Sequence, residues 1–163
     1  MSSDPGKLQR FECAIEGNRK RLLSIARSYA SGDDCRDLYQ DILCEIWQHF
    51  DSYSEKSGIN TWVYRVALNV ASTFKSKALR RVEHSAQLDE STAAYEAGTA
   101  DHERQIAILA DFMDSLDSTD RAIFQLYLDN LNYHEMAEIT RFNEAYLRVR
   151  ISRLKKKFAD RYI

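Results

Sequence analysis

The last quarter of the chain concentrates cationic side chains that could hold phosphate and read DNA bases. Residues 141–161 contain eight basic residues but only two acids, Glu144 and Asp160. Lysine and arginine neutralise backbone phosphates, and one arginine can donate two hydrogen bonds to O6 and N7 of a guanine. The pattern fits a DNA-binding helix or, as the simpler alternative, a basic terminal helix that is only solvated.

Two predicted helices position these cations. Residues 133–139 form a short amphipathic segment, the chain breaks at Arg141 and Phe142, and Asn143 is expected to cap the next helix through its side-chain oxygen. Apolar residues at i, i+4, i+7 and i+11 share one face of that second helix: Leu147, Ile151, Leu154 and Phe158. The basic residues begin near its N-terminal end, where a recognition helix contacts bases. The pattern therefore predicts a DNA-binding helix-turn-helix.

Composition predicts an all-α fold. The 163 residues include one proline and five glycines, and the apolar spacing is helical throughout. With 44% hydrophobic residues the chain can build one or two small cores. The net charge of the whole chain is only −2, so the positive charge of the C-terminal segment is a local property of the sequence. Local charge decides what that part of the surface attracts.

The sequence gives no support for membrane insertion, secretion, metal binding or catalysis. No apolar run approaches the roughly 18 residues of a membrane span, so we expect no membrane insertion, and the N-terminus lacks the apolar core of a secretory signal. Cys13, Cys35 and Cys44 are odd in number and lack metal-ligand spacing, which suits a reducing cytoplasm. The four histidines are scattered, and no nucleophile or phosphate-loop motif is present. We therefore expect no catalytic residue, no cofactor and no metal site.

Three helices are predicted in the first half, over residues 8–29, 35–50 and 62–81. We expect Asp33 or Asp34 to cap the second of these helices, and Thr61 to cap the third. Residues 1–7 are polar and are expected to be disordered. We expect residues 51–60 to form a polar loop before the third helix.

The second half begins after an acidic stretch. Residues 83–103 contain six acids and no lysine or arginine, and we expect a linker without regular structure over residues 83–102. It could shield the basic helix, a hypothesis that rests on charge alone. A helix follows from about residue 102, and Ser118 or Thr119 is expected to cap the next one, over residues 120–128.

A stripe of acids runs along the predicted second helix. Asp37, Asp41 and Glu45 recur at i, i+4 and i+8. Like charges at this spacing mildly destabilise a helix, so a basic partner surface would relieve them. A solvated face is the equal alternative.

Three blocks of the chain resemble the extracytoplasmic-function (ECF, group IV) sigma factors of the sigma-70 family. They are DDCRDLYQDILCEIWQHFDSY at 33–53, GINTWVYRVALNVASTFKSKALRR at 58–81, and the segment 116–158 that ends in the basic helix. Their order and spacing are specific, whereas the helix-turn-helix alone is not. The resemblance implies two small helical domains: sigma region 2 over residues 8–82 and sigma region 4 over 103–163, joined by a flexible linker over 83–102.

The resemblance also implies partners and sites. The chain would bind the largest subunits of core RNA polymerase and promoter DNA, and an anti-sigma factor is a candidate partner because many family members have one. The polymerase-binding residues would be Asp37, Gln40, Asp41 and Glu45. The −10 element would be opened and held by Tyr53, Asn60, Trp62, Tyr64, Arg65, Asn69, Lys75, Lys77, Arg80 and Arg81. Trp62 also fits a core position beside Val66 and Val70.

In the recognition helix, the resemblance implies base contacts from Arg148, Val149, Ser152 and Arg153 to the −35 element. Asn143, Arg150, Lys155 and Lys156 would contact phosphates and fix the register. Arg141 stands where the family has a turn glycine, so we expect a reshaped turn. Tyr146 and Val149 stand where it has small polar residues, so the −35 preference should differ from the common one.

Three other readings of the sequence remain. A stand-alone helix-turn-helix regulator explains the last quarter but leaves residues 33–81 without a role. A protein-binding helical adaptor predicts no nucleic-acid affinity at any salt concentration. An enzyme has the least support. The promoter sequence and the inducing signal are not encoded in any recognisable pattern.

Overall fold

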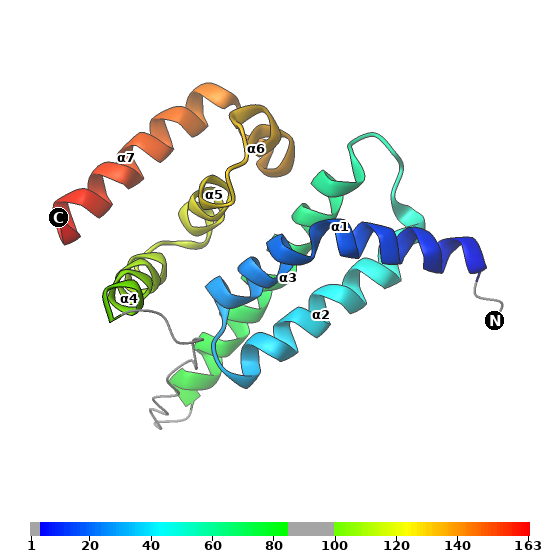
Figure 1. Cartoon of the computed structure of the whole chain (residues 1–163), viewed down its shortest axis with the longest axis horizontal. Coiled ribbons are helices and arrows are strands. Elements are labelled where there is room, and N and C mark those ends of the chain that lie inside the picture. The colour runs from blue at the N-terminus through cyan, green and yellow to red at the C-terminus, as the bar shows by residue number, and fades with distance from the viewer. Residues whose placement is uncertain (1–3, 85–99) are drawn as a thin grey trace. The chain divides into compact units, whose positions relative to one another are not determined.

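The computed structural model describes residues 4–84 and 100–163, with side chains left undescribed at 78–84. All regular structure in these residues is helical, which confirms the all-α prediction. The chain forms two compact units, Met1–Thr92 and Ala93–Ile163 (Figure 1), and each has its own buried apolar residues. The predicted linker lies largely outside the described residues.

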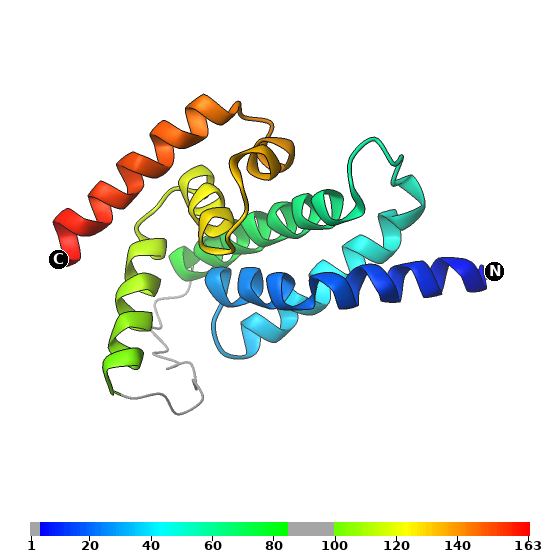
Figure 2. The same ribbon diagram turned by 45° about the horizontal axis from the view of Figure 1, so that its top comes forward.

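The first unit contains three long helices that lie side by side (Figures 1 and 2). They are α1 (Pro5–Tyr29), α2 (Asp33–His49) and α3 (Ile59–His84), and a short 3-10 turn, η1 (Phe50–Ser52), follows α2. Each helix packs against both of the others. Gly32 joins α1 to α2 with φ 58°, a left-handed conformation that glycine adopts at little cost.

The core of the first unit is built from one apolar face of each helix. Leu22, Ile25 and Ala26 of α1 are fully buried, and so are Ile42 and Ile46 among the apolar residues of α2. From α3, apolar side chains three or four residues apart enter the same core: Val63, Ala67 and Ala71. Burying each larger aliphatic side chain contributes about 1.5–3 kcal/mol before the entropy cost of ordering it.

Three of the predicted helix starts are wrong. α1 begins at Pro5, capped by Asp4, whose side chain accepts a hydrogen bond from the Gly6 amide, so residues 5–7 are helical. α2 begins with both candidate caps already in its first turn, since Gly32 is the N-cap. α3 begins at Ile59, which places Thr61 inside the helix.

The second unit contains α4 (Ala100–Asp114), α5 (Ser118–Leu128), α6 (Tyr133–Thr140) and α7 (Glu144–Tyr162). Phe112 of α4 lies in edge-to-face contact with Phe124 of α5 and Phe158 of α7. Aliphatic side chains complete this core: Ile123, Leu126, Met136, Ile139, Leu147, Ile151 and Leu154.

Asp117 caps α5, since its side chain accepts a hydrogen bond from the Asp120 amide. The predicted caps, Ser118 and Thr119, are the first two residues of the helix. In the described part of the chain, every helix is too short or too polar to span a bilayer.

Candidate nucleic-acid interface

The helix-turn-helix is built from α6 and α7, and both helices begin with a side-chain cap. Asn132 and Glu135 form a capping box at the start of α6, each side chain accepting a hydrogen bond from the other residue's backbone amide. Asn143 caps α7 by accepting a hydrogen bond from the Tyr146 amide at 2.8 Å, as predicted. Capping satisfies amides that would otherwise lack a partner, worth roughly 1 kcal/mol each.

Arg141 ends α6 in the left-handed conformation, with φ 65° and ψ 10°. Its amide donates to the Ala137 carbonyl at 2.8 Å, as a helix C-terminus requires. The expectation of a reshaped turn is therefore wrong. The backbone keeps the conformation that suits glycine, and arginine carries the steric cost.

The outward face of α7 carries most of the residues predicted to bind the −35 element. Six of those within α7 are exposed: Arg148, Val149, Ser152, Arg153, Lys155 and Lys156. Buried Leu147, Ile151 and Leu154 hold the opposite face against the unit's core. The Arg148 guanidinium lies over the Tyr133 ring, 4.3 Å from its centroid, and 3.5 Å from the Glu144 carboxylate.

Arg150 does not lie with these cations. Its Nε and Nη2 donate to the two carboxylate oxygens of Asp120 in α5, at 2.5 and 2.8 Å. These hydrogen bonds, and the negative charge of Asp120, raise the pKa of Arg150 above its ordinary value. The phosphate contact from Arg150 stays a prediction, and in this structure its guanidinium fork is occupied within the unit.

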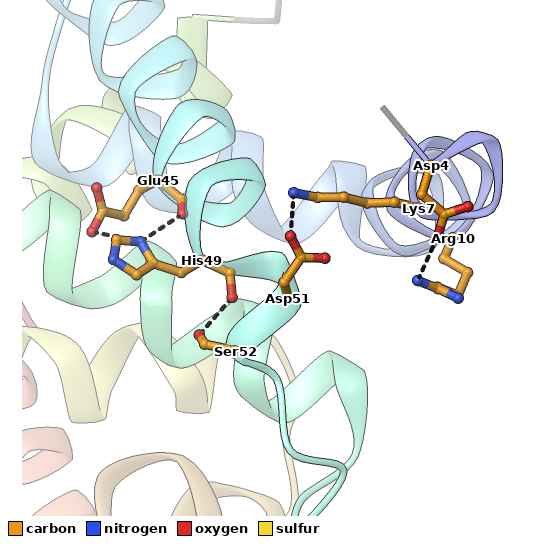
Figure 3. Close-up of polar contacts among 7 residues, drawn as sticks. All are labelled: Asp4, Lys7, Arg10, Glu45, His49, Asp51 and Ser52. Atoms are coloured by element: carbon orange, nitrogen blue, oxygen red, sulfur yellow. Dashed lines mark hydrogen bonds and ion pairs between the residues drawn. The ribbon is translucent and has the colours of Figure 1, made fainter. Parts of the chain in front are cut away.

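The predicted acidic stripe lies on the exposed face of α2. Asp37, Gln40 and Asp41 are exposed, and Glu45 is half-buried. Figure 3 shows that the Glu45 carboxylate meets His49 one turn later, with 3.3 Å between Oε1 and Nδ1. Asp37 and Asp41 are thus better placed than Glu45 to meet a basic partner.

A groove of about 840 Å³ runs between α2 and α3. On the α2 side its lining includes Asp41 and Glu45 of the stripe, and on the α3 side it includes Trp62, Asn69 and Lys77, which were predicted to bind DNA. Three apolar residues of α3 also line it: Val66, Val70 and Phe74. The groove therefore brings together residues that sequence reasoning assigned to two different partners.

Trp62 belongs to an aromatic cluster beneath the polar loop. Its ring lies 6.1 Å from that of Phe50 and 5.6 Å from that of Tyr53, centroid to centroid. The Tyr53 hydroxyl donates to the Ser57 carbonyl at 2.5 Å. Trp62 and Tyr53 are both half-buried, so they hold the loop and also present an edge to solvent.

Lys7 joins the N-terminal turn of α1 to this end of the unit. Its ammonium group lies 2.8 Å from the Asp51 carboxylate (Figure 3) and 4.4 Å from the centroid of the Trp47 ring. Asp51 is in η1, directly before the loop. The loop is therefore tied to α1 as well as to α3.

Asn60 is held by a residue that sequence reasoning missed. Buried Asn18 of α1 donates through Nδ2 to the Ala14 carbonyl at 2.8 Å and to Oδ1 of Asn60 at 2.9 Å. A backbone carbonyl can only accept, so this contact identifies Nδ2 of Asn18 and therefore Oδ1 of Asn60. Asn60 is exposed, and its Nδ2 group takes no part in this contact with Asn18. A polar residue on the apolar face of α1 is the signal that could have pointed to Asn18.

Tyr64 was wrongly predicted to contact DNA. It is only 1% exposed, and its hydroxyl is buried without a hydrogen-bond partner among the described residues. One residue along the helix, Arg65 is half-buried, as is Lys75, while Asn69 and Lys77 are exposed. The predicted Arg80 and Arg81 lie in α3, outside the described side chains.

Comparison with known proteins identifies relatives over both units. The Sigma-70 region 2 family model matches residues 14–81, within the first unit. The ECF RNA polymerase sigma-E factor of Haemophilus influenzae is 24% identical over 170 residues, which cover 96% of this chain and 89% of that protein. The ECF RNA polymerase sigma-E factor of Escherichia coli K12 is 27% identical and covers 93% of this chain and 85% of its own length.

A solved structure shares the fold. The sigma factor RpoE of Bartonella quintana, crystallised with the anti-sigma factor NepR, superposes with a TM-score of 0.73 at 23% identity. The match covers 93% of this chain and 96% of the solved one. The helical architecture of both units is thus one that a sigma factor adopts.

Proposed function

This chain belongs to the extracytoplasmic-function sigma factors of the sigma-70 family, and we infer from this membership that it directs core RNA polymerase to specific promoters and initiates transcription there. The similarity to sigma-E factors along nearly the whole chain carries this conclusion. A stand-alone helix-turn-helix regulator would need only the second unit and gives the first no role. The chain acts as a regulatory subunit and not as an enzyme.

The first unit is the polymerase-binding part in this proposal. Asp37, Gln40, Asp41 and Glu45 would meet a basic surface on the largest subunits of the core enzyme. Support comes from the exposure of Asp37, Gln40 and Asp41 on one helix. Opposite charges across such an interface set the register and the association rate more than the final affinity.

The same unit would hold the −10 element. Opening DNA requires that unstacked bases be captured, and a pocket with stacking side chains repays their unstacking. Tyr53, Asn60 and Trp62 lie at the loop end of the unit, and Asn69 lines the groove. Arg65, Lys75, Lys77, Arg80 and Arg81 of α3 would hold backbone phosphates.

The second unit would read the −35 element through α7. Arg148, Val149, Ser152 and Arg153 would contact bases, while Lys155, Lys156 and Asn143 would contact phosphates. The exposure of the first six and the helix-turn-helix geometry support this assignment. Because core polymerase acts in the cytoplasm, we propose the same location for the chain, and an anti-sigma factor as a further partner.

Run-off transcription with purified core polymerase over a library of genomic fragments tests the function. We expect discrete transcripts that require this chain, and alignment of their start sites yields both promoter elements. Gel shifts on those promoters, with and without core polymerase, then separate the two functions. A stand-alone regulator shifts the DNA alone, whereas a sigma factor does so mainly within the holoenzyme. Transcription that is unchanged by the chain refutes the proposal.

A further inference from the structure

An apolar strip occupies the turn of the helix-turn-helix and the outward face of α7. The strip consists of Phe142, Tyr146 and Val149, which are 37%, 40% and 51% exposed. The rings of Phe142 and Tyr146 pack together, with their centroids 4.8 Å apart. These three are half of the large apolar side chains that are exposed in the described part of the chain. The strip is therefore a concentration of apolar surface in the segment proposed to enter DNA.

Val149 lies on the outward face of α7, away from the unit's buried core. At 3.6 residues per turn it is rotated by roughly 200° from Leu147, which is fully buried. Tyr146 lies about 60° away from Val149 around the helix axis. A recognition helix presents this face to the floor of the major groove.

Cations surround the strip and indicate what covers it. Arg148 and Arg153 flank Val149, Lys156 follows it by two turns, and all three are exposed. Protein interfaces are depleted in lysine at their cores and bury about 800 Å² on each partner, more than three half-exposed side chains provide. A polyanion fits the charges, so the apolar strip must meet an apolar group within DNA.

The major groove contains one such group on the bases of unmodified DNA, the C5 methyl of thymine. We propose that Val149 contacts a thymine methyl group in the −35 element, with Tyr146 held beside it by Phe142. This inference deepens the proposed function and rests on it. It makes Val149 a specificity residue that separates thymine from cytosine without a hydrogen bond.

The test uses holoenzyme and a promoter obtained by run-off selection. Each thymine of the −35 element is replaced in turn by deoxyuridine, which removes the methyl group and keeps the hydrogen-bonding edge. At one position we expect the dissociation constant to rise about fourfold, the effect of one methyl group left unburied. With Val149→Ala the ratio between deoxyuridine and thymine DNA should fall to near one. Leu128→Ala, which shortens an exposed apolar side chain outside the strip, should keep the wild-type ratio.

Four outcomes overturn the inference while the proposed function stands. The first is that deoxyuridine has no effect at any position although base-pair exchanges still weaken binding, and the second is that the selected −35 element contains only G·C pairs. The third is that Val149→Ala weakens binding equally on thymine and deoxyuridine DNA. The fourth is that Val149→Ala weakens binding to core polymerase, as a protein contact would. If exchanging the whole −35 element changes nothing, the assignment of α7 to that element fails instead. Thermal unfolding of Val149→Ala checks that this variant has kept its fold.

Discussion

Arg150 of α7 donates two hydrogen bonds to the carboxylate of Asp120 in α5, at 2.5 and 2.8 Å, and the two residues are 30 positions apart in the sequence. The Asp120 side chain is 11% exposed and that of Arg150 is 32% exposed. Asp120 lies in the first turn of α5, where the helix dipole also favours a negative charge. The pair fixes the recognition helix to the scaffold of the second unit, and this fixes the face that α7 presents.

Replacing Asp120 should therefore weaken DNA binding although it removes a negative charge. In Asp120→Asn the half-buried side chain of Arg150 loses its counter-charge and its charge-assisted hydrogen bonds, so we expect Tm to fall by a few degrees and promoter affinity to fall severalfold. Thermal unfolding and holoenzyme gel shifts measure both. Asp160→Asn is the matched control, because this exposed acid of α7 is outside the pair. A rise in affinity for Asp120→Asn would mean that Arg150 is released to bind phosphate, contrary to its role here.

Arg141→Gly should stabilise the turn between α6 and α7. The left-handed backbone at this position, with φ 65°, strains arginine but not glycine, so we expect a gain of about 0.5–1 kcal/mol. Hydrogen exchange of the α6 and α7 amides reports the local free energy of opening. Asn143→Ala should change the same amides in the opposite direction by about 1 kcal/mol, because it removes the α7 cap. Equal protection in wild type and Arg141→Gly would contradict the first expectation.

Charge reversal of the acidic stripe should impair assembly with polymerase. In Asp37→Lys with Asp41→Lys, two exposed carboxylates become cations, and we expect affinity for core polymerase to fall at least tenfold at low salt. The difference should shrink as salt screens the charges. Fluorescence anisotropy of the labelled chain titrated with core enzyme measures this. Glu12→Lys changes an exposed acid of α1 and should have little effect.

Asn60→Asp should slow promoter opening more than Asn60→Ala does. Asn18 donates to Oδ1 of Asn60, so the wild-type side chain offers hydrogen-bond donors outward. The aspartate can still accept from Asn18, but it presents a charged acceptor to the DNA. Permanganate reactivity of unpaired thymines measures the open complex. Equal opening by the aspartate variant and the wild type would exclude Asn60 as a donor to the −10 strand.

The Cys35 thiol should react slowly with alkylating reagents. Burial raises the pKa of Cys35, and the positive charge of Arg27 offsets this only in part. The folded chain therefore holds the thiol proton more tightly than the unfolded chain, and this contribution to stability is lost as the pH rises through the raised pKa. In a Cys13→Ser, Cys44→Ser background, alkylation should reach half its maximal rate at a higher pH when the chain is folded than in urea. The same midpoint in both states would contradict this.

Much of the helical framework could be predicted because periodicity is a local property. The apolar positions of α7, its Asn143 cap and the break at Arg141 all follow from spacing within about 20 residues. Cap identity was less predictable before α5, where Asp117, Ser118 and Thr119 are similarly good caps. The N-cap preferences of these three residues differ too little for the sequence alone to identify the cap.

The side-chain partners were harder to predict because they come from distant segments. Arg150 resembles its cationic neighbours in sequence, and only the packing of α5 against α7 gives it Asp120. Tyr64 lies in the first turns of α3, close to the polar loop in sequence, yet its side chain faces the core. Asn18 bonds to Asn60 across 42 residues, which no local pattern encodes.

Both ends of α6 are capped by adjacent residues. The capping box of Asn132 and Glu135 lies at its N-terminal end, and Arg141 in the left-handed conformation lies at its C-terminal end. A helix of eight residues is unstable in isolation, because the free-energy cost of nucleation exceeds the stabilisation gained from two helical turns. In this chain the capping interactions and the buried side chains of Met136 and Ile139 stabilise α6 in the absence of DNA. Docking then requires no coil-to-helix step in this segment, so its encounter with DNA should proceed at the pace of rigid-body association and show little heat-capacity change from folding.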